Sequence, residues 1–217
     1  MKNLLLFLVF ACTFSFSCLG SPVPFSPIVR NYSVLDYNAG NENWAVAQDE
    51  RGVMYFGNNS GLLRYDGSRW RLFPLPTSGI VRAVYVASDR RIYVGSFEEF
   101  GYFEQNDLNL LEYHSLKEQV KGFDFHNDEI WTIVEQGGNI IFQSFGSYFI
   151  YDGKGTKGVR CPELPLNLFR IGDTLYSQLI NGGVCTFAGD KFIPLISRQE
   201  SVSYTHLRAH ETDQYLV

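Results

Sequence analysis

The chain has 217 residues and a net charge of −5, with 16% aromatic and 19% charged residues. A chain this rich in aromatic residues and poor in charged ones is folded and strand-rich, which excludes a disordered segment. Its acidic balance and its lack of any run of basic residues count against a nucleic-acid-binding surface. We therefore expect no nucleic-acid partner for this segment.

Residues 1–20 have the features of a secretion signal. Lys2 supplies the positive start, and residues 4–10 form an apolar run that is too short to span a bilayer. Cys18-Leu19-Gly20 then provides the positions that a signal peptidase reads. We expect an exported chain that is cleaved after Gly20, with acylation at Cys18 or an uncleaved anchor as the alternatives.

Residues 21–43 precede the first regular pattern. The stretch 21–26 holds two prolines and predicts a linker, whereas residues 28–35 alternate weakly between apolar and polar side chains. A strand at this position of a propeller joins the last blade and closes the ring. We therefore predict a linker and a ring-closing strand over residues 21–43.

Residues 44–74 are the clearest unit of the chain and predict four short strands. The expected strands are residues 44–47, 53–56, 62–65 and 69–73. The first three are apolar or aromatic, as buried strands prefer, and the fourth alternates like an outer strand with one wet face. Gly52 and the hairpin signal Asp66-Gly67 supply turns, and Pro74 ends the unit.

The same pattern recurs downstream, in units over residues 81–114, 130–161 and 168–196. An aromatic residue closes the third strand of each unit: Tyr65, Tyr102, Tyr151 and Phe187. The intervals are 37, 49 and 36 residues, which average about 41 and match the period of four-stranded propeller blades. The sequence therefore predicts an all-β fold, a partial β-propeller of about four four-stranded antiparallel blades. A β-sandwich with evenly spaced strands is the alternative.

Two features of the blades follow from this alignment. The long second interval is explained by a charged connection over residues 115–127. Most aromatic side chains fall at strand positions, where we expect them to pack between blades.

The repeat pattern stops after Ile196. Residues 202–212 read VSYTHLRAHET, and their back-translation resembles a transposon-end sequencing adaptor, with residues 213–217 as the index region beyond it and a genuine polar tail as the alternative. We therefore interpret residues 202–217 as an artefact and exclude them from the fold. Because the adaptor-like segment interrupts the reading frame, we expect the native frame to continue into further blades and this chain to be an N-terminal fragment.

No motif for a phosphate-binding loop, a nucleophile elbow or a dinucleotide site is present in the sequence. Glu98 and Glu99 are the best carboxylate pair, but adjacent residues in a turn rarely span a sugar as a glycosidase requires, and a solvated turn is the favoured interpretation. Cys161 and Cys185 remain after signal cleavage, and we expect them not to pair. We expect neither a metal nor a cofactor, and no catalytic residue.

Residues 41–70 resemble the two-component-regulator propeller repeat family. The matching segments are residues 43–49, Gly52, residues 55–58, 61–63 and 65–67, and Trp70. Residues 92–95, 142–145 and 148–153 are similar to further copies, so that the resemblance covers about residues 28–196.

The resemblance implies a bacterial sensor whose propeller lies in the periplasm. In such proteins a triple-tyrosine β-sandwich, one membrane helix and a cytoplasmic output module follow. The output is a histidine kinase with a receiver, or a LuxR-type DNA-binding domain, and residues 93–103 look more like the DNA-binding type. The known ligands of the family are often glycan fragments.

We therefore expect the periplasmic ligand-sensing propeller of an inner-membrane signal-transduction or transcription regulator. Its partners would be a glycan or other small ligand, the downstream domains of the same chain and a second copy in a full-length dimer. The ligand would meet the turns between second and third strands, at Asn58, Asn59, Ser96, Glu98, Glu99 and Asn181. The alternatives are a protein-interaction scaffold and a secreted propeller enzyme that acts on polysaccharide.

Overall fold

The structure is a computed structural model that describes residues 29–77, 79–108, 110–161, 163–180, 182–188 and 191–196. The expected signal sequence, the adaptor-like tail and Asn181 lie outside the described residues. The chain divides into two units at the boundary between Tyr32 and Ser33, and all of the described strands lie in the second unit.

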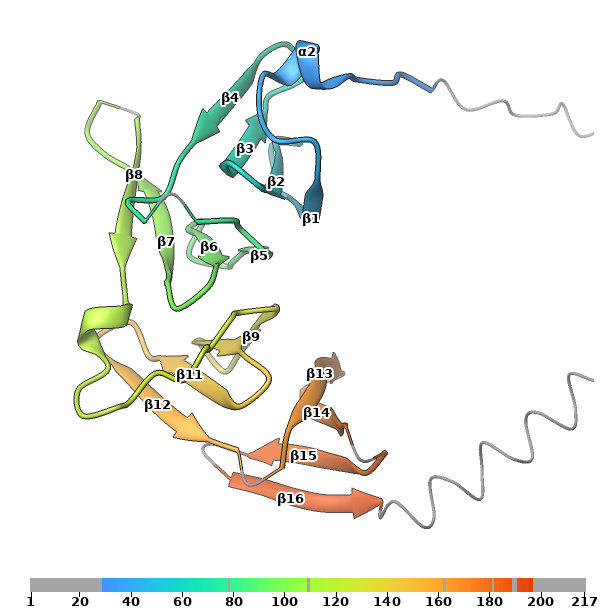
Figure 1. Cartoon of the computed structure of the whole chain (residues 1–217), viewed down its shortest axis with the longest axis vertical. Helices are drawn as coiled ribbons and strands as arrows, with labels where there is room; N and C mark the ends of the chain where they lie inside the picture. Colours follow the sequence, from blue (N-terminus) through green and yellow to red (C-terminus); the bar gives the residue numbers. More distant parts are fainter. Residues whose placement is uncertain are drawn as a thin grey trace, which may run out of the picture. The chain divides into compact units, whose positions relative to one another are not determined.

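The second unit is built almost entirely of strands. Of the described residues, 52% are in strands and 4% in helices, and the strands form four four-stranded antiparallel sheets. Each sheet is a simple meander in which consecutive strands pair. The prediction of a partial β-propeller with four blades is confirmed (Figure 1).

The blades follow one another along the chain. Blade 1 contains β1 (Asn43–Gln48), β2 (Met54–Asn58), β3 (Gly61–Tyr65) and β4 (Trp70–Phe73). Blade 2 contains β5 (Ala83–Val86), β6 (Ile92–Gly95), β7 (Phe100–Gln105) and β8 (Leu111–Ser115). Blade 3 contains β9 (Thr132–Gln136), β10 (Asn139–Gln143), β11 (Ser147–Tyr151) and β12 (Thr156–Arg160). Blade 4 contains β13 (Pro165–Ile171), β14 (Thr174–Leu179), β15 (Val184–Ala188) and β16 (Lys191–Ile196).

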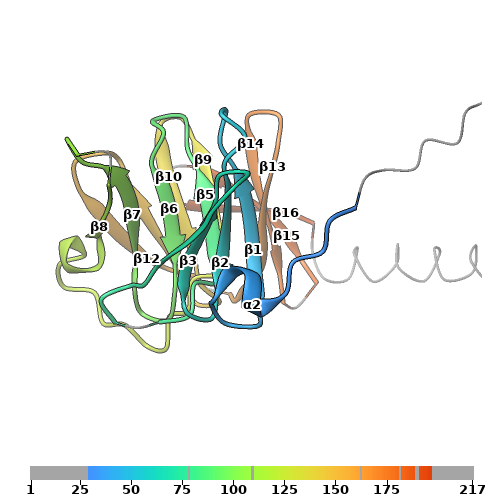
Figure 2. The same cartoon turned by 90° about the horizontal axis from the view of Figure 1, so that it is seen from above.

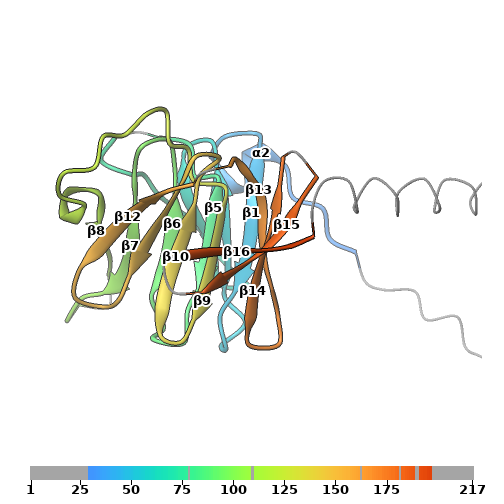
Figure 3. The same cartoon turned by 90° about the horizontal axis from the view of Figure 1, so that it is seen from below.

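The first strand of each blade is the inner one. β1, β5, β9 and β13 contact one another in that order and lie along one side of the set of blades, whereas β4, β8, β12 and β16 lie along the other (Figure 1). The turns gather at two opposite ends of the sheets (Figures 2 and 3). Turns between second and third strands therefore lie at one end, and turns between first and second strands lie at the other.

Three apolar cores fill the seams between successive blades. The first joins Tyr55 and Leu62 of blade 1 to Ile92 and Phe103 of blade 2. The other two include the following residues: Tyr93, Phe100, Phe142 and Phe149 between blades 2 and 3, and Ile141, Tyr148, Leu168 and Phe187 between blades 3 and 4. The expectation that aromatic strand residues pack between blades holds for these side chains, because a sheet must bury a face of each blade against its neighbour.

Glycines at the end of the second strand bring successive blades close together. A Cβ on Gly57 would lie 2.6 Å from the Val81 carbonyl oxygen, and one on Gly95 would lie 2.6 Å from Ile130 Cβ. The same residues form a repeated hydrogen bond between blades. The Val81 N–H donates to the Asn58 carbonyl at 3.1 Å, and the Ile130 N–H donates to the Ser96 carbonyl at 3.0 Å.

The predicted ring-closing strand is wrong for the described part of residues 28–35. Residues 29–33 are not in a strand, and α2 (Val34–Tyr37) is a single helical turn. The carboxylate of Asp36 accepts hydrogen bonds from both the N–H and the hydroxyl of Ser33, at 2.6 and 2.8 Å. This local pairing favours a helix start over an extended strand. Tyr37 then packs its ring 5.5 Å from that of Trp70 in β4.

The connection between blades 2 and 3 contains more structure than its charged composition suggests. A short 3₁₀ helix, η1 (Lys117–Gln119), lies within it. Leu116 and Val120, on either side of η1, are buried in the core between blades 2 and 3. The connection is therefore part of that seam.

Among the described residues, no helix has the length and apolar character needed to span a membrane. Cys161, just after β12, and Cys185, in β15, are both free thiols. Burial raises the pKa of the Cys161 thiol to about 12, which keeps it protonated at neutral pH.

Replacing Gly95 by alanine should separate blades 2 and 3, because the new methyl group has no room against Ile130. We expect Gly95→Ala to lower the free energy of unfolding by about 1–3 kcal/mol, measured by urea denaturation. Gly155→Ala is the matched control, because a Cβ there meets no atom within 4 Å, and it should change stability by less than about 0.5 kcal/mol. Equal effects of the two substitutions would contradict the close approach at Gly95.

Candidate ligand-binding rim

Side chains from three blades converge where the inner strands begin. Trp44 lies in β1, Arg82 directly precedes β5, and Trp131 directly precedes β9. Because β1, β5 and β9 contact one another in order, these three residues meet at one end of the blades. Together with Glu129 and Phe145 they form what we call the rim cluster.

Arg82 is the centre of the rim cluster. Its guanidinium carbon lies 3.7 Å from the centroid of the Trp44 ring and 5.1 Å from that of Trp131. The two indole rings are 6.3 Å apart and nearly perpendicular. The Arg82 Nε donates to the Glu129 carboxylate at 2.7 Å, which offsets the buried positive charge. Cation–π attraction and the ion pair therefore hold one arginine against two indole rings.

Aromatic rings are exposed around this centre. Trp44 is 44% exposed and Phe145 is 43% exposed, and the Phe145 ring lies 5.6 Å from that of Trp131. Phe97, which is 52% exposed, forms a backbone bridge with Glu129. Most other large aromatic side chains of the blades are in the seams, so solvent-facing rings at this end are a departure from core packing.

Two hydrogen-bond donors of the rim cluster have no partner within the described part of the chain. They are Nη1 of Arg82 and Nε1 of Trp131, and both are buried. A buried donor without an acceptor is costly, and because both atoms are closed to solvent, a ligand reaches them only if the rim cluster rearranges. The part of the rim cluster that is open to a ligand is its exposed rings, which suit the apolar face of a sugar.

Asn59, one of the sequence-predicted site residues, directly supports the rim cluster. Its Oδ1 accepts a hydrogen bond from Nε1 of Trp44 at 2.7 Å, and its Nδ2 donates to the Glu42 carboxylate at 3.1 Å. The asparagine thus fixes the orientation of the most exposed indole ring. The structure places this predicted residue at the site.

Asn58 is next to Asn59 in sequence but has a different environment. Its side chain is completely buried, and its Nδ2 donates to the carbonyls of Gly40 and Glu42 and to Oδ1 of Asn43. Its Oδ1 accepts the N–H groups of Gly40 and Ser60, both at 2.9 Å. These bonds use the hydrogen-bonding capacity of the amide, so Asn58 fastens residues 40–43 to blade 1.

The predicted turn residues of blade 2 point in different directions. Ser96 is completely buried. Glu98, at a φ of +46°, accepts the Asn127 N–H at 3.1 Å and lies 3.7 Å from Lys117 Nζ. The structure therefore does not bring Ser96, Glu98 and Glu99 together into one pocket, and Asn181 lies outside the described residues.

The interpretation of Glu98 and Glu99 as a solvated turn is wrong for Glu99. Glu99 is only 7% exposed, and its Oε1 accepts the hydroxyl groups of Tyr113 and Ser115, both at 2.7 Å. Burial and the nearby Glu99 charge raise the pKa of Tyr113, so its hydroxyl stays a donor. Because the two carboxylates engage different partners, they do not flank a common substrate position.

Sequence reasoning missed Trp44, Arg82, Glu129, Trp131 and Phe145. A signal was present, because Trp44 and Trp131 occupy the same position in units 1 and 3, about 20 residues before the closing aromatic. Assigning all strand aromatics to the core by default hid this repetition. Among the described residues, no group of three or more His, Cys, Asp or Glu is arranged to hold a metal ion.

Comparison with known sequences gives no match. No family model matches the chain, and no curated protein matches it.

Comparison with solved structures finds similar folds at low sequence identity. The extracellular domain of the one-component system BT4673 from B. thetaiotaomicron matches at 17% identity and a TM-score of 0.54, over 70% of this chain and 21% of that one. The extracellular domain of the hybrid two-component system BT3049 from the same organism matches at 14% identity and a TM-score of 0.53, over 71% and 22%. Virginiamycin B lyase from Staphylococcus aureus matches at 10% identity and a TM-score of 0.58, over 71% and 55%.

These likenesses establish a shared propeller fold. The structural neighbours include extracellular domains of bacterial sensors and also an enzyme, so the fold is common to both classes. The chain spans about a fifth of the length of the sensor domains and about half that of the lyase.

Asn58 and Asn59 provide a matched pair for testing which residue is structural. We expect Asn58→Ala to lower the free energy of unfolding by about 2–4 kcal/mol, because several buried partners lose their hydrogen bonds. Asn59→Ala should cost less than about 1 kcal/mol and should instead change the fluorescence of Trp44, whose indole N–H loses its acceptor. Urea denaturation followed by tryptophan emission measures both, and equal costs would contradict the assignment.

Proposed function

We propose that this chain is the ligand-sensing propeller of an extracytoplasmic bacterial sensor, and that it recognises a glycan at the rim cluster. The observation that carries the proposal is the set of exposed aromatic rings around Arg82, built from three successive blades. The export signal expected at residues 1–20 and the likeness to extracellular sensor domains support the cellular setting.

The chemistry of the rim suits a sugar. The C–H groups on one face of a pyranose pack against an exposed indole or phenyl ring, such as Trp44 or Phe145. Its hydroxyl groups need polar partners at the edge of the ring, the role available to the Glu129 carboxylate, whose side chain is 24% exposed. Mostly apolar walls with a few placed polar groups are typical of small-ligand sites.

The origin of the rim residues suits a sensor. Because Trp44, Arg82 and Trp131 come from different blades, a ligand that contacts them links the packing of those blades. It would then favour one arrangement of the propeller over another by its difference in affinity. In a full-length inner-membrane parent, the downstream domains and a second copy of the chain would receive that shift.

We infer a binding role rather than catalysis for this segment. The carboxylates of Glu98 and Glu99 engage different partners, Lys117 and Asn127 for Glu98, and Tyr113 and Ser115 for Glu99. A glycosidase requires two carboxyl groups about 5–10 Å apart across one sugar, each free to act on it.

The test is binding of neutral oligosaccharides to the full chain. A panel of cello-, xylo-, malto- and arabino-oligosaccharides is screened by tryptophan fluorescence, and the best ligand is titrated by calorimetry. We expect the double variant Trp44→Ala and Phe145→Ala to bind this ligand at least about tenfold more weakly, or about 1.4 kcal/mol. The loss follows from removing the exposed rings on which the sugar stacks.

Phe169→Ala is the matched control, because Phe169 is a 39% exposed aromatic of β13 whose ring stacks at 5.9 Å on Tyr176, outside the rim cluster. Its affinity for the glycan should equal that of the unmodified chain. The proposal fails if no member of the panel binds at millimolar concentration, or if the double variant binds as tightly as the control. Stable capture of a protein partner with no glycan bound would instead support an interaction scaffold.

A further inference from the structure

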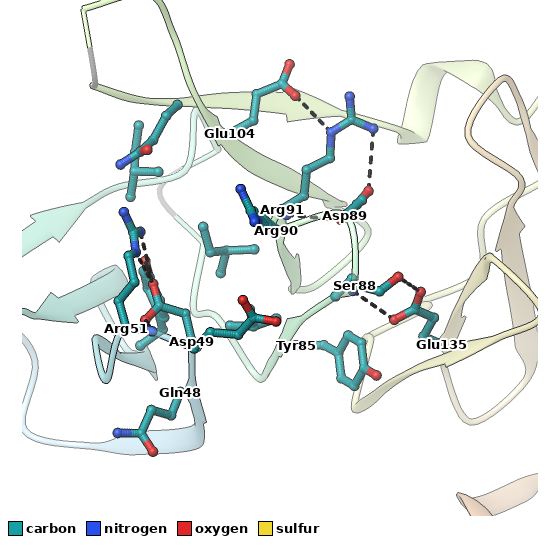
Figure 4. A pocket seen from close by; sticks show the side chains of 17 residues that line it. Gln48, Asp49, Arg51, Tyr85, Ser88, Asp89, Arg90, Arg91, Glu104 and Glu135 are labelled. Atoms are coloured by element: carbon teal, nitrogen blue, oxygen red, sulfur yellow. Dashed lines mark hydrogen bonds and ion pairs between the residues drawn. The ribbon is translucent and has the colours of Figure 1, made fainter.

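Several charged side chains at the end of the blades opposite the rim cluster are paired with one another at the surface. They line a cavity that is bounded by the turns between first and second strands of blades 1 and 2 (Figure 4). In its wall, Arg51 lies 3.0 Å from Asp49, and Arg91 donates to Glu104 at 2.8 Å. The Arg51 side chain is 63% exposed and that of Arg91 is 30% exposed, so solvent screens these pairs and they are ordinary surface contacts.

Asp128 is a charged residue of a different kind. It lies in the connection between blades 2 and 3, and it is only 2% exposed. Its Oδ1 accepts the Ser144 hydroxyl at 2.6 Å, and its Oδ2 lies 3.3 Å from Nη1 of Arg160. Both partners belong to blade 3, because Ser144 directly follows β10 and Arg160 ends β12. The buried carboxylate therefore fastens the connection to two strands of blade 3, and losing a partner of such a buried charge is costly.

The backbone around Asp128 is bonded to the previous blade. The Asp128 carbonyl accepts the Glu98 N–H at 2.8 Å, and the Ile130 N–H donates to the Ser96 carbonyl at 3.0 Å. Both of these blade 2 residues lie in or beside the turn between β6 and β7. Residues 127–130 are thus held between the turn of blade 2 and the strands of blade 3.

Glu129 follows Asp128 directly and is the acidic member of the rim cluster. Its Oε1 accepts a hydrogen bond from Nε of Arg82 at 2.7 Å. The Arg82 guanidinium in turn lies 3.7 Å from the centroid of the Trp44 ring in blade 1. Two neighbouring carboxylates of one connection therefore serve different partners, one in blade 3 and one in the rim cluster.

We propose that Asp128 positions the rim cluster. Its carboxylate holds residues 127–130 on blade 3, so that Glu129 meets Arg82 and keeps the guanidinium against the Trp44 ring. Because Asp128 is buried, it does not touch a ligand on the exposed rings and acts through Glu129 as a positioning residue. The effect on ligand affinity rests on the glycan-binding function proposed above, whereas the effect on the geometry of the rim cluster does not.

The first experiment follows the Trp44 ring. The sequence has three tryptophans, so Trp70→Phe together with Trp131→Phe leaves Trp44 as the only one. In this chain, Asp128→Asn keeps the size of the side chain and removes its charge. We expect the emission to shift to longer wavelength and its quenching by acrylamide to increase, because Arg82 no longer stays over the ring.

Three further variants separate positioning from a general loosening of blade 3. In a Glu129→Gln background, Asp128→Asn should add no further shift, since its effect passes through Glu129. Ser144→Ala removes one partner of the buried carboxylate, should shift the emission in the same direction, and decides the case if Asp128→Asn does not fold. Asp152→Asn is the matched control, because Asp152 accepts backbone N–H groups in the turn between β11 and β12, outside the rim cluster, and it should leave the emission unchanged.

The second experiment is a calorimetric titration of the chain with its natural tryptophans, using the tightest-binding oligosaccharide of the panel above. Asp128→Asn should weaken binding at least about fivefold, and Asp152→Asn should not. If no oligosaccharide binds, the proposed function fails and the emission of Trp44 alone decides the role of Asp128. The positioning role is overturned if Asp128→Asn leaves the emission unchanged, if its shift is as large in the Glu129→Gln background, or if the variant binds a glycan as tightly as the unmodified chain.

Discussion

The contact on which the rim depends is that of Arg82 with two indole rings and one carboxylate. Arg82 comes from the segment that enters blade 2, Trp44 from blade 1, and Trp131 and Glu129 from the segment that enters blade 3. One largely buried cation at the start of blade 2 thus contacts side chains from blades 1 and 3. Because the Arg82 side chain is only 15% exposed, its attraction to the rings and to Glu129 is weakly screened by solvent.

The backbone makes this convergence possible. Val81 and Ile130 each lie two residues before the inner strand of their blade, β5 and β9. Each donates its N–H to a carbonyl at the end of the second strand of the previous blade. Gly57 and Gly95 leave the room that this approach requires. The same geometry gathers the turns between first and second strands at the opposite end of the blades (Figures 2 and 3). The rim cluster therefore follows from a single repeated connection between blades.

The repeat could be predicted from sequence because it is local. Strand pattern, turn chemistry and the closing aromatics recur within each unit, so the blades and their order follow from neighbouring residues. The predicted ring-closing strand failed because the bonds from Ser33 to Asp36 favour a helical turn. The rim cluster depends on contacts between blades, and a pattern within one blade does not reveal which residues meet. Asn59 was identified from its turn, whereas Arg82 required the assembled sheets.

The most direct measurement is a double-mutant cycle between Arg82 and Trp44. Arg82→Met keeps the aliphatic bulk without the charge, Trp44→Leu keeps an apolar side chain without the ring, and urea denaturation gives the free energy of unfolding for both single variants and the double variant. If Arg82 holds the rim together, the coupling energy should be about 0.5–2 kcal/mol. Costs that add within about 0.3 kcal/mol would show that the two residues are independent, and would contradict this account of the rim.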